Sequence, residues 1–392
     1  MVIMDQKRQV AIVMVTYIGG GLEKVTDIIV EKLRRRGYEF SLFVSKIGDF
    51  VNERARQTYD HISIVPELGQ YNGGDTIALA KAMEGKHFDT VWLAHTDLKN
   101  VDQLRRVLPP ECQLIYHMHN TPLYRAIISD TNPFFGRHKP FREAKWFITK
   151  HLKEKLFKVY TRRALKRIRG MAEEVDRYIV LCEKDVYVMQ KFFPDLSDKF
   201  DYVLNPIPQV TVAKNQMQKQ KEVLFLGRLN LTEKRPDRLL KIWSKVCRNH
   251  PDWKLKFVGN GPNEQQIKRI VSKLGINDSV EFCGYSLDPK QHLMSASILC
   301  LTSEYEGFGL VLVEAMQYSV VPMAFNCANG VEMLLQDGRG VLIKKHHIND
   351  YARELSKLMT SVQLRDEINK RNADFPKLFD PDIIADRWCE IL

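Results

Sequence analysis

The sequence predicts an α/β fold with two domains, each built on a parallel sheet that helices cover on both faces. The chain has 392 residues, which is long for one hydrophobic core, because single domains typically contain ~100 to 200 residues. Strand-length apolar runs alternate with amphipathic helical stretches in both halves, and this alternation favours parallel βαβ units. Residues 206–221 begin with prolines and continue with polar residues. We expect this stretch to link the two domains.

Composition restricts the class of protein. The hydrophobic content of 44% is ordinary for a globular protein, and no stretch approaches the ~18 to 20 apolar residues that span a bilayer. The apolar run Val10–Val15 has only strand length and no small-residue cleavage site follows it, so we do not interpret it as a signal peptide. The seven cysteines are scattered without a CxxC pair, which argues against a disulfide framework and a zinc site. A reducing cytoplasm fits this pattern best.

The N-terminal half opens with a strand, a glycine turn and a helix. We expect the strand over Val10–Thr16 and the helix over Leu22–Arg36, with Gly19, Gly20 and Gly21 between them. This order is typical of the first unit of a Rossmann-like domain, in which glycines let a ligand approach the backbone. A tight turn without a ligand is the alternative. The GxGxxG motif and the acidic residue of a nicotinamide site are missing, which disfavours a stored cofactor of that type.

Two histidines follow later strands of this half. The further strands that we expect here are Phe40–Ser45, His61–Val65, Thr90–Ala94, Gln113–His117 and Arg177–Cys182. His95 and His119 therefore lie at or just beyond carboxyl ends of strands, where ligand crevices form in open parallel sheets. A hydrogen-bonded structural histidine is the alternative, and it suits His95 better than His119.

A cationic turn follows the first strand of the second half. We expect that strand over Glu222–Leu226 and a helix from Pro236, because proline suits the first helical position. Arg228 and Lys234 flank the turn between them. A bidentate Arg fork and a mobile Lys charge at such a turn suit a diphosphate. The alternative is a pair of solvated loop residues.

An acidic βα turn lies within residues 299–317, which read LCLTSEYEGFGLVLVEAMQ. A strand-length apolar run changes there to a helical period. Two glycines flank Phe308 where the helix begins, so backbone N–H groups and the helix dipole favour a bound anion. Glu306 lies in the turn and Glu314 in the second helical turn, so both carboxylates can reach one ligand. Carboxylates that accept from hydroxyls beside an anion site suit a sugar nucleotide, whereas solvated helix residues are the alternative.

The positive charge is concentrated in one segment. The net charge is +11, and residues 137–170 contain thirteen Lys and Arg against two Glu. Apolar residues recur there every three or four positions, as in an amphipathic helix. We interpret the segment as a surface for anionic lipid, where each Lys or Arg is worth ~1 kcal/mol. The aromatic residues that would insert are Phe134, Phe135, Phe141, Trp146 and Phe147. The alternatives are a helix that packs its apolar stripe on the domain, and nucleic-acid binding, which no accompanying motif supports.

Three stretches resemble one enzyme family. EGFGLVLVEAM at residues 306–316 resembles the signature of glycosyltransferase family 4, whose members are retaining enzymes of the GT-B fold. YHMHNTP at residues 116–122 is similar to the histidine turn of the family's first domain. GRLNLTEK at residues 227–234 matches the family's spacing of an Arg directly after a strand and a Lys a few residues on.

The resemblance implies a GT-B architecture, with two Rossmann-like domains whose parallel sheets face each other across a cleft. It implies an acceptor-side domain over residues 1–208, which a C-terminal helix over residues 378–392 completes. Residues 209–377 would form the donor-binding domain.

The resemblance also implies roles for individual residues. Arg228 and Lys234 would neutralise the departing diphosphate, Glu306 would hold sugar hydroxyls, and His119 would orient the sugar or stabilise positive charge, which makes these four residues the expected catalytic set. The donor-binding set would include Arg228, Lys234 and Glu306 together with Gly20, Gly21, Asp288, Phe308, Gly309, Leu310 and Glu314. We expect no metal and no cofactor beyond the nucleotide-sugar co-substrate, because cationic side chains and a helix terminus would replace the metal.

We therefore expect a retaining glycosyltransferase that moves a hexosyl unit from a nucleotide sugar, UDP-linked, to a cell-surface glycan or a lipid-linked acceptor. We expect it in the cytoplasm, peripheral at the inner face of the cell membrane, and without a nucleic-acid partner. One alternative is a nucleotide-sugar epimerase of the same two-domain architecture, which needs no acceptor. The others are a sugar phosphorylase, for which no pyridoxal lysine is found, and a non-enzymatic module that binds anionic membranes.

Overall fold

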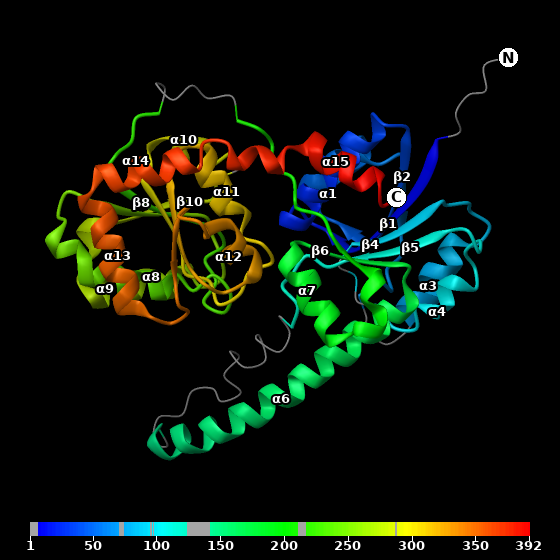
Figure 1. The fold of residues 1–392 in the computed structure, drawn as a ribbon, viewed down its shortest axis with the longest axis horizontal. Coiled ribbons are helices and arrows are strands. Elements are labelled where there is room, and N and C mark those ends of the chain that lie inside the picture. The colour runs from blue at the N-terminus through cyan, green and yellow to red at the C-terminus, as the bar shows by residue number, and fades with distance from the viewer. Residues whose placement is uncertain are drawn as a thin grey trace. The chain divides into compact units, whose positions relative to one another are not determined.

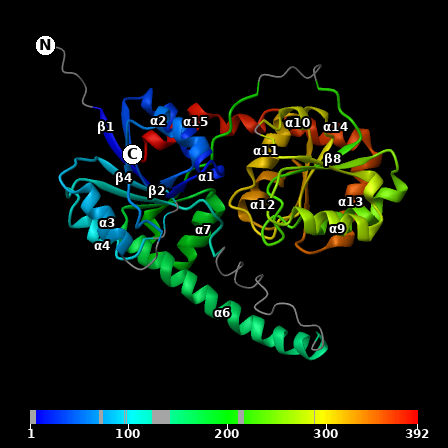
Figure 2. The ribbon, with the colours of Figure 1, turned by 180° about the vertical axis from the view of Figure 1, so that it is seen from behind.

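The computed structural model describes residues 7–69, 74–94, 96, 98–123, 142–210, 217–286 and 288–392, with side chains of the helix from Arg142 described only from Lys158 onward. The chain divides into two compact units (Figures 1 and 2). Unit 1 contains Met1–Pro122, Arg162–Pro206 and Phe379–Leu392, and unit 2 contains Leu123–Thr161 and Ile207–Leu378. Each unit holds one parallel sheet with helices, so the predicted α/β class is confirmed. None of the described helices combines the length and apolar character needed to cross a bilayer.

Unit 1 is built on a seven-stranded sheet with the order β3-β2-β1-β4-β5-β6-β7. All neighbouring strands are parallel. The strands are β1 (Arg8–Tyr17), β2 (Tyr38–Ile47), β3 (His61–Ile64), β4 (Thr90–Ala94), β5 (Gln113–His117), β6 (Arg177–Val180) and β7 (Phe200–Tyr202). Every residue of β4 is buried, as expected for a strand between two helical layers. The strand order reverses between β1 and β4, which is where open parallel sheets bind ligands beyond their carboxyl ends.

The helices of this part of the chain follow from the same alternation. They are α1 (Gly21–Arg34), α2 (Asn52–Thr58), α3 (Gly74–Met83), α4 (Asp102–Arg105), α6 (Arg142–Glu174), α7 (Glu183–Phe192) and α15 (Pro381–Cys389). The last helix, α15, lies beside α1 (Figure 1). Ion pairs of 2.7 Å join Lys32 to Asp382 and Arg36 to Asp386. The end of the chain is therefore an integral part of unit 1.

Unit 2 is built on a six-stranded parallel sheet with the order β10-β9-β8-β11-β12-β13. The strands are β8 (Glu222–Leu226), β9 (Lys254–Val258), β10 (Val280–Gly284), β11 (Ile298–Leu301), β12 (Val321–Phe325) and β13 (Val341–Ile343). The helices are α8 (Pro236–Val246), α9 (Glu264–Leu274), α10 (Lys290–Ser295), α11 (Leu310–Gln317), α12 (Asn329–Leu335), α13 (Ile348–Thr360) and α14 (Val362–Arg371). The order reverses between β8 and β11. The turns that follow these two strands therefore meet at the switch point of the sheet.

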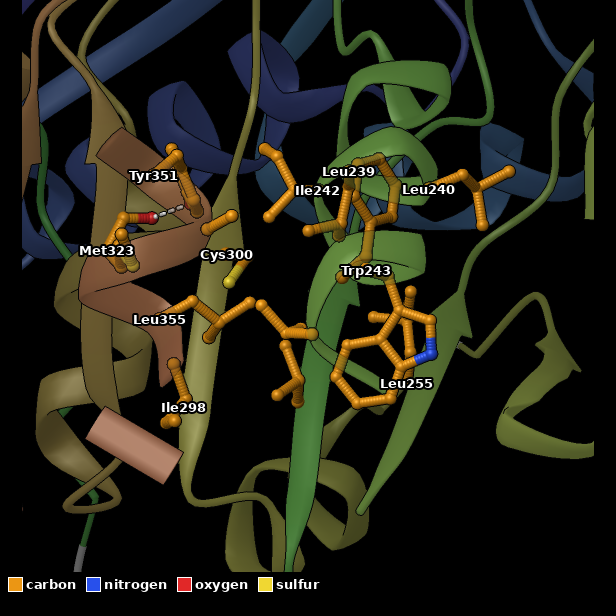
Figure 3. Close-up of a cluster of buried hydrophobic side chains, with 14 of the residues drawn as sticks. Leu239, Leu240, Ile242, Trp243, Leu255, Ile298, Cys300, Met323, Tyr351 and Leu355 are labelled. Atoms are coloured by element: carbon orange, nitrogen blue, oxygen red, sulfur yellow. Dashed lines mark hydrogen bonds between the residues drawn. The ribbon is translucent and has the colours of Figure 1, made fainter. Parts of the chain in front are cut away.

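The apolar faces of α8 and α13 form the core of unit 2 on the sheet (Figure 3). Trp243 is fully buried, and its indole N–H donates to the Ser279 hydroxyl at 2.9 Å. Tyr351 of α13 donates its hydroxyl to the Met323 carbonyl of β12 at 2.8 Å. These contacts fix the helices on the sheet, and through α8 they fix the turn that leads out of β8.

Replacement of the fully buried Leu240 by Ala tests this core. The lost apolar contacts and the cavity should lower the free energy of unfolding by about 2 to 5 kcal/mol, measured by urea denaturation. Val362→Ala is the control, because Val362 is 60% exposed and its loss should change stability by less than about 0.5 kcal/mol. Equal effects of the two substitutions would contradict this description of the core.

Candidate functional site

The cationic turn after β8 is held by the backbone of a neighbouring loop. A Cβ atom on Gly261 would lie 2.5 Å from the carbonyl oxygen of Leu229, and one on Gly259 would overlap the carbonyl of Gly227. Gly259 also has φ of +133°, so only glycine fits there without strain. The Leu229 N–H donates to the Asn260 carbonyl at 2.8 Å. This close approach fixes the path of the chain just beyond β8.

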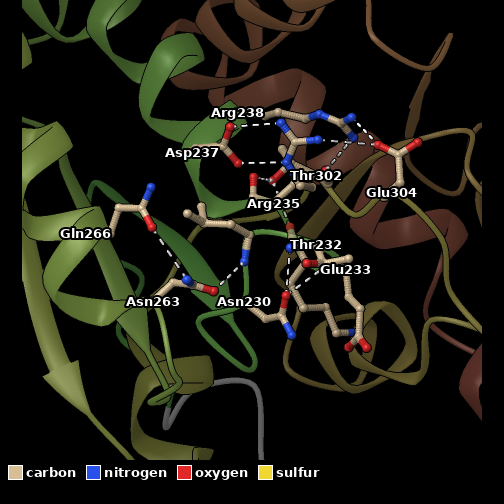
Figure 4. A network of polar contacts seen from close by, with 12 residues as sticks. Asn230, Thr232, Glu233, Arg235, Asp237, Arg238, Asn263, Gln266, Thr302 and Glu304 are labelled. Atoms are coloured by element: carbon tan, nitrogen blue, oxygen red, sulfur yellow. Dashed lines mark hydrogen bonds and ion pairs between the residues drawn. The ribbon is translucent and has the colours of Figure 1, made fainter. Parts of the chain in front are cut away.

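Asn230 shapes the rest of the turn (Figure 4). Its side-chain oxygen accepts from the backbone N–H of Thr232 at 2.7 Å and of Glu233 at 3.2 Å. The N–H of Leu231 donates to the side-chain oxygen of Asn263 at 3.1 Å. Asn and Asp stabilise turns in this way because their side chains bond to nearby backbone groups. The turn that carries Arg228 and Lys234 is therefore ordered before any ligand binds.

Lys234 and Glu306 form an ion pair inside unit 2. The Lys234 ammonium lies 2.7 and 2.8 Å from the two carboxylate oxygens of Glu306. The Ser303 hydroxyl donates to the same carboxylate at 2.5 Å, and Glu306 is 7% exposed. Burial disfavours the charged amine, but the charge and hydrogen bonds of Glu306 outweigh it and raise the pKa of Lys234. The structure thus brings together the residue expected at the diphosphate and the residue expected at the sugar.

Arg228 is a different kind of cation. Its side chain is exposed, and within the described part of the chain its guanidinium forms no hydrogen bond or ion pair. It directly follows Gly227 at the carboxyl end of β8. A guanidinium offers parallel N–H donors that match a phosphate or carboxylate. Arg228 is therefore available to an anionic ligand.

The acidic turn after β11 leads into α11, whose first residue is Leu310. Gly309 precedes this helix in the left-handed region, with φ of +91°, which favours glycine. Phe308 is 2% exposed, and a Cβ on Gly330 would lie 3.0 Å from its carbonyl oxygen. The Phe308 side chain is thus a packing group. The Leu312 N–H donates to the Gly309 carbonyl at 2.9 Å, while the N–H groups of Leu310 and Val311, the first two of the helix, lack intrahelical acceptors by geometry. An anion would meet backbone donors here.

Two further candidates of unit 2 lie near a shared tyrosine. Asp288 is exposed and its carboxylate accepts from the Lys290 N–H at 3.0 Å, at the start of α10. Glu314 lies half-buried in α11. Burial raises the pKa of Tyr318, and the charges of Asp288 and Glu314 raise it further. Both carboxylates are therefore near enough to Tyr318 for their charges to affect it, and Asp288 also has a structural role at the start of α10.

The glycine turn of unit 1 is shaped by an acid that sequence reasoning missed. Glu23 is 5% exposed, and its carboxylate accepts from the Ile18 N–H at 3.0 Å. A Cβ on Gly20 would lie 2.8 Å from a Glu23 oxygen, whereas one on Gly21 would meet nothing within 4 Å. Close approach of Glu23 explains the glycine at position 20. Open space at Gly21 is compatible with a ligand.

His119 follows β5 in unit 1 and lies in a cluster of aromatic rings that contact one another at tilted or edge-on angles. Its ring centroid is 3.9 Å from that of His117, which is 5.1 Å from Trp388 of α15. Trp388 also packs on Trp92 with centroids 4.2 Å apart. The C-terminal helix thus supports the histidine turn. His95, the other histidine considered from the sequence, lies outside the described residues.

A second charged cluster surrounds Glu304, and the sequence did not draw attention to it (Figure 4). Glu304 is 3% exposed and pairs with Arg238 and with Lys345, the latter at 2.7 Å. Arg235 lies 3.6 Å from the same carboxylate. Burial would raise the pKa of Glu304, but the hydrogen bond and charge of Lys345 and the charge of Arg238 lower it. In the described ranges no three His, Cys, Asp or Glu side chains gather as metal ligands would.

The contribution of the Lys234–Glu306 pair to the free energy of unfolding can be tested by substitution. Lys234→Met leaves an almost fully buried carboxylate without its cation, which typically costs about 3 to 5 kcal/mol. The double variant Lys234→Met with Glu306→Gln removes both charges and should recover most of that loss in urea denaturation. A double variant no more stable than Lys234→Met would contradict a direct pair.

Known proteins resemble parts of this chain. Residues 209–375 match the family model described as "Glycosyl transferases group 1". An uncharacterised glycosyltransferase of Haemophilus influenzae is 30% identical over 220 residues, which are 55% of this chain and 61% of that protein. The amylovoran biosynthesis glycosyltransferase AmsD of Erwinia amylovora is 31% identical over 175 residues, 44% of this chain and 48% of that protein. The chain thus spans about half to three-fifths of the length of these relatives.

Solved structures agree with the fold. Anabaena HepE in complex with UDP and glucose has a TM-score of 0.70 at 15% identity, over 98% of this chain and 99% of that one. WaaG, a glycosyltransferase involved in lipopolysaccharide biosynthesis, has a TM-score of 0.68 at 15% identity, over 97% of this chain and 99% of that one. These likenesses confirm the predicted GT-B fold. The family match and the named relatives support the prediction of a glycosyltransferase.

Proposed function

We propose that this chain is a retaining glycosyltransferase of family 4 that moves a hexosyl unit from a UDP-sugar to a cell-surface glycan or lipid-linked acceptor. The observation that carries the proposal is the switch point of unit 2, where Arg228, the Lys234–Glu306 pair and the start of α11 follow adjacent strands. The same residues lie within the segment that matches the group 1 glycosyltransferase model.

The geometry of the ion pair suits a donor that carries both hydroxyls and a diphosphate. The Lys234 ammonium has three N–H donors, and the two Glu306 oxygens account for two short contacts. One donor can therefore point to phosphate while the lysine stays paired. The Glu306 oxygens have several lone pairs, so the carboxylate can also accept from sugar hydroxyls. The pair could thus contact the donor on both sides of the bond that breaks, with Lys234 at the phosphate and Glu306 at the sugar.

In the proposed reaction the acceptor hydroxyl oxygen bonds to the anomeric carbon while the bond from that carbon to the diphosphate oxygen breaks. The leaving phosphate takes the acceptor proton, so attack and departure occur on the same face. Arg228 and Lys234 stabilise the negative charge that grows on the diphosphate. Phe308, Gly309 and Leu310 contribute backbone N–H groups, Glu314 holds the ribose, and His119 orients the sugar. Asp288, Gly20 and Gly21 complete the proposed donor site.

Arg228→Ala is the sharpest test, because Arg228 is exposed and has no partner among the described residues, so its loss should leave the fold intact. The expected result is a fall in sugar transfer of ~10²-fold or more, measured with radiolabelled UDP-sugars and a membrane lipid extract. Lys241→Ala, an exposed lysine on α8, is the control and should transfer normally.

The same assay separates the alternatives. We propose that no metal or cofactor takes part, so transfer should persist in EDTA. Equal transfer by Arg228→Ala and wild type would remove Arg228 from the site. A changed sugar released with free UDP in the absence of acceptor would favour an epimerase.

We further propose that the chain adsorbs to the inner face of the cell membrane through residues 137–170. In the described part of α6, Ala164, Ile168 and Met171 are buried. The basic residues exposed on the remaining surface are Lys158, Arg162, Arg163, Lys166 and Arg167. These three side chains pack within the protein, whereas Val159 of the same helix is 41% exposed. The exposed charges are what a membrane would attract.

Liposome flotation tests the membrane proposal. The wild-type protein should float with anionic vesicles at low salt and dissociate from them as the salt concentration rises. The triple variant Lys158→Ala, Arg162→Ala and Lys166→Ala should bind roughly 100-fold more weakly, because each cation near an anionic surface contributes about 1 kcal/mol. Equal flotation with neutral and anionic vesicles would rule out this electrostatic surface.

A further inference from the structure

Glu304 holds the cationic turn through its backbone. Its N–H donates to the Glu233 carbonyl at 2.6 Å. This carbonyl belongs to the peptide bond that joins Glu233 to Lys234. The Thr302 hydroxyl donates to the Arg235 carbonyl at 3.1 Å. The chain that leaves β11 is therefore bonded to the cationic turn on both sides of Lys234.

The Glu304 side chain holds the same turn from the other direction. One carboxylate oxygen pairs with Arg238 in the first turn of α8, and the other pairs with Lys345, which follows β13, at 2.7 Å. Arg238 is 6% exposed. One buried acid thus connects the segments that follow β8, β11 and β13.

The backbone between these contacts is strained. Arg235 has φ of +51°, a left-handed conformation that costs energy for a residue with a side chain. Its guanidinium forms a two-pronged contact with Asp237 at 2.9 Å on both oxygens and lies 3.6 Å from Glu304 (Figure 4). The strained residue directly follows Lys234. The charged cluster therefore maintains a conformation that the turn would not adopt alone.

We propose that Glu304 is a positioning residue for the diphosphate subsite: it fixes the turn so that Lys234 meets both Glu306 and the diphosphate. This inference rests on the proposed function. Glu304 would act through Lys234 and would not itself touch the donor, because its two oxygens are occupied by Arg238 and Lys345. Its loss should weaken diphosphate recognition and leave nucleoside recognition unchanged.

The test compares UDP with uridine, which lacks the diphosphate. Binding to wild type, Glu304→Gln, Lys234→Ala and the double variant is measured by calorimetry for UDP and by NMR titration for uridine. Glu304→Gln should weaken the binding of UDP by about tenfold, a coupling of ordinary size for residues in one network, and should leave the binding of uridine unchanged. In the Lys234→Ala background the same substitution should have no further effect on UDP. Equal losses for UDP and uridine, or additive losses in the double variant, would overturn the proposal.

A second substitution covers the case in which Glu304→Gln does not fold. Lys345→Met removes the partner whose side chain is 24% exposed and keeps the buried pair with Arg238. It should weaken the binding of UDP severalfold and leave the binding of uridine unchanged. The effect on UDP binding should again vanish in the Lys234→Ala background. Lys344→Met, at the exposed neighbouring position, is the matched control and should bind both ligands like wild type.

The outcomes distinguish the two proposals. Wild-type protein that binds neither UDP nor any other nucleoside diphosphate would overturn the proposed function. Wild-type protein that binds UDP, together with Glu304 and Lys345 variants that bind it equally well, would overturn only the positioning role.

Discussion

The buried pair of Lys234 and Glu306 is the interaction on which the site in unit 2 depends. A carboxylate that is 7% exposed keeps its charge only when a cation and hydrogen bonds compensate for lost water. Lys234 and Ser303 provide that compensation. Because the two residues follow adjacent strands β8 and β11, the pair also joins the two turns at the switch point. The donors that surround this point, including Arg228 and the start of α11, take their positions from these turns.

Much of the fold could be predicted because buried parallel strands are short apolar runs with clear ends. The expected bounds of β4, β5 and β8 agree with the structure, at Thr90–Ala94, Gln113–His117 and Glu222–Leu226. The helices α13 and α14 are not among the predicted elements, although α13 buries Tyr351 and Leu355 on one face. Its amphipathic period was readable, but no motif lies on it.

The candidate site was predictable in its residue types and in its place at the sheet edge, but not in its pairings. Parallel topology brings the turns after neighbouring strands together, so Arg228, Lys234 and Glu306 could be grouped from the chain alone. Which cation faces which acid depends on backbone conformation. The left-handed Arg235 and the buried Glu304 have no signature in a single sequence, since an acid in a turn is usually solvated. Gly20 shows the same limit, because its neighbour is the Glu23 carboxylate.

In the proposed donor site, Lys234 and Arg228 would play different electrostatic roles toward the diphosphate. A paired lysine attracts an anion weakly, because the charge of Glu306 opposes the approach of a diphosphate. In the proposed reaction its fixed position would nevertheless stabilise the charge on the diphosphate without reorganisation. Arg228 is exposed and, among the described residues, has no partner, so its charge is not cancelled locally and would attract the diphosphate of the proposed donor. In the proposed site, attraction by an unpaired guanidinium and orientation by a paired ammonium would be separate tasks, which is consistent with one cation held by the buried Glu306 and the other exposed to solvent.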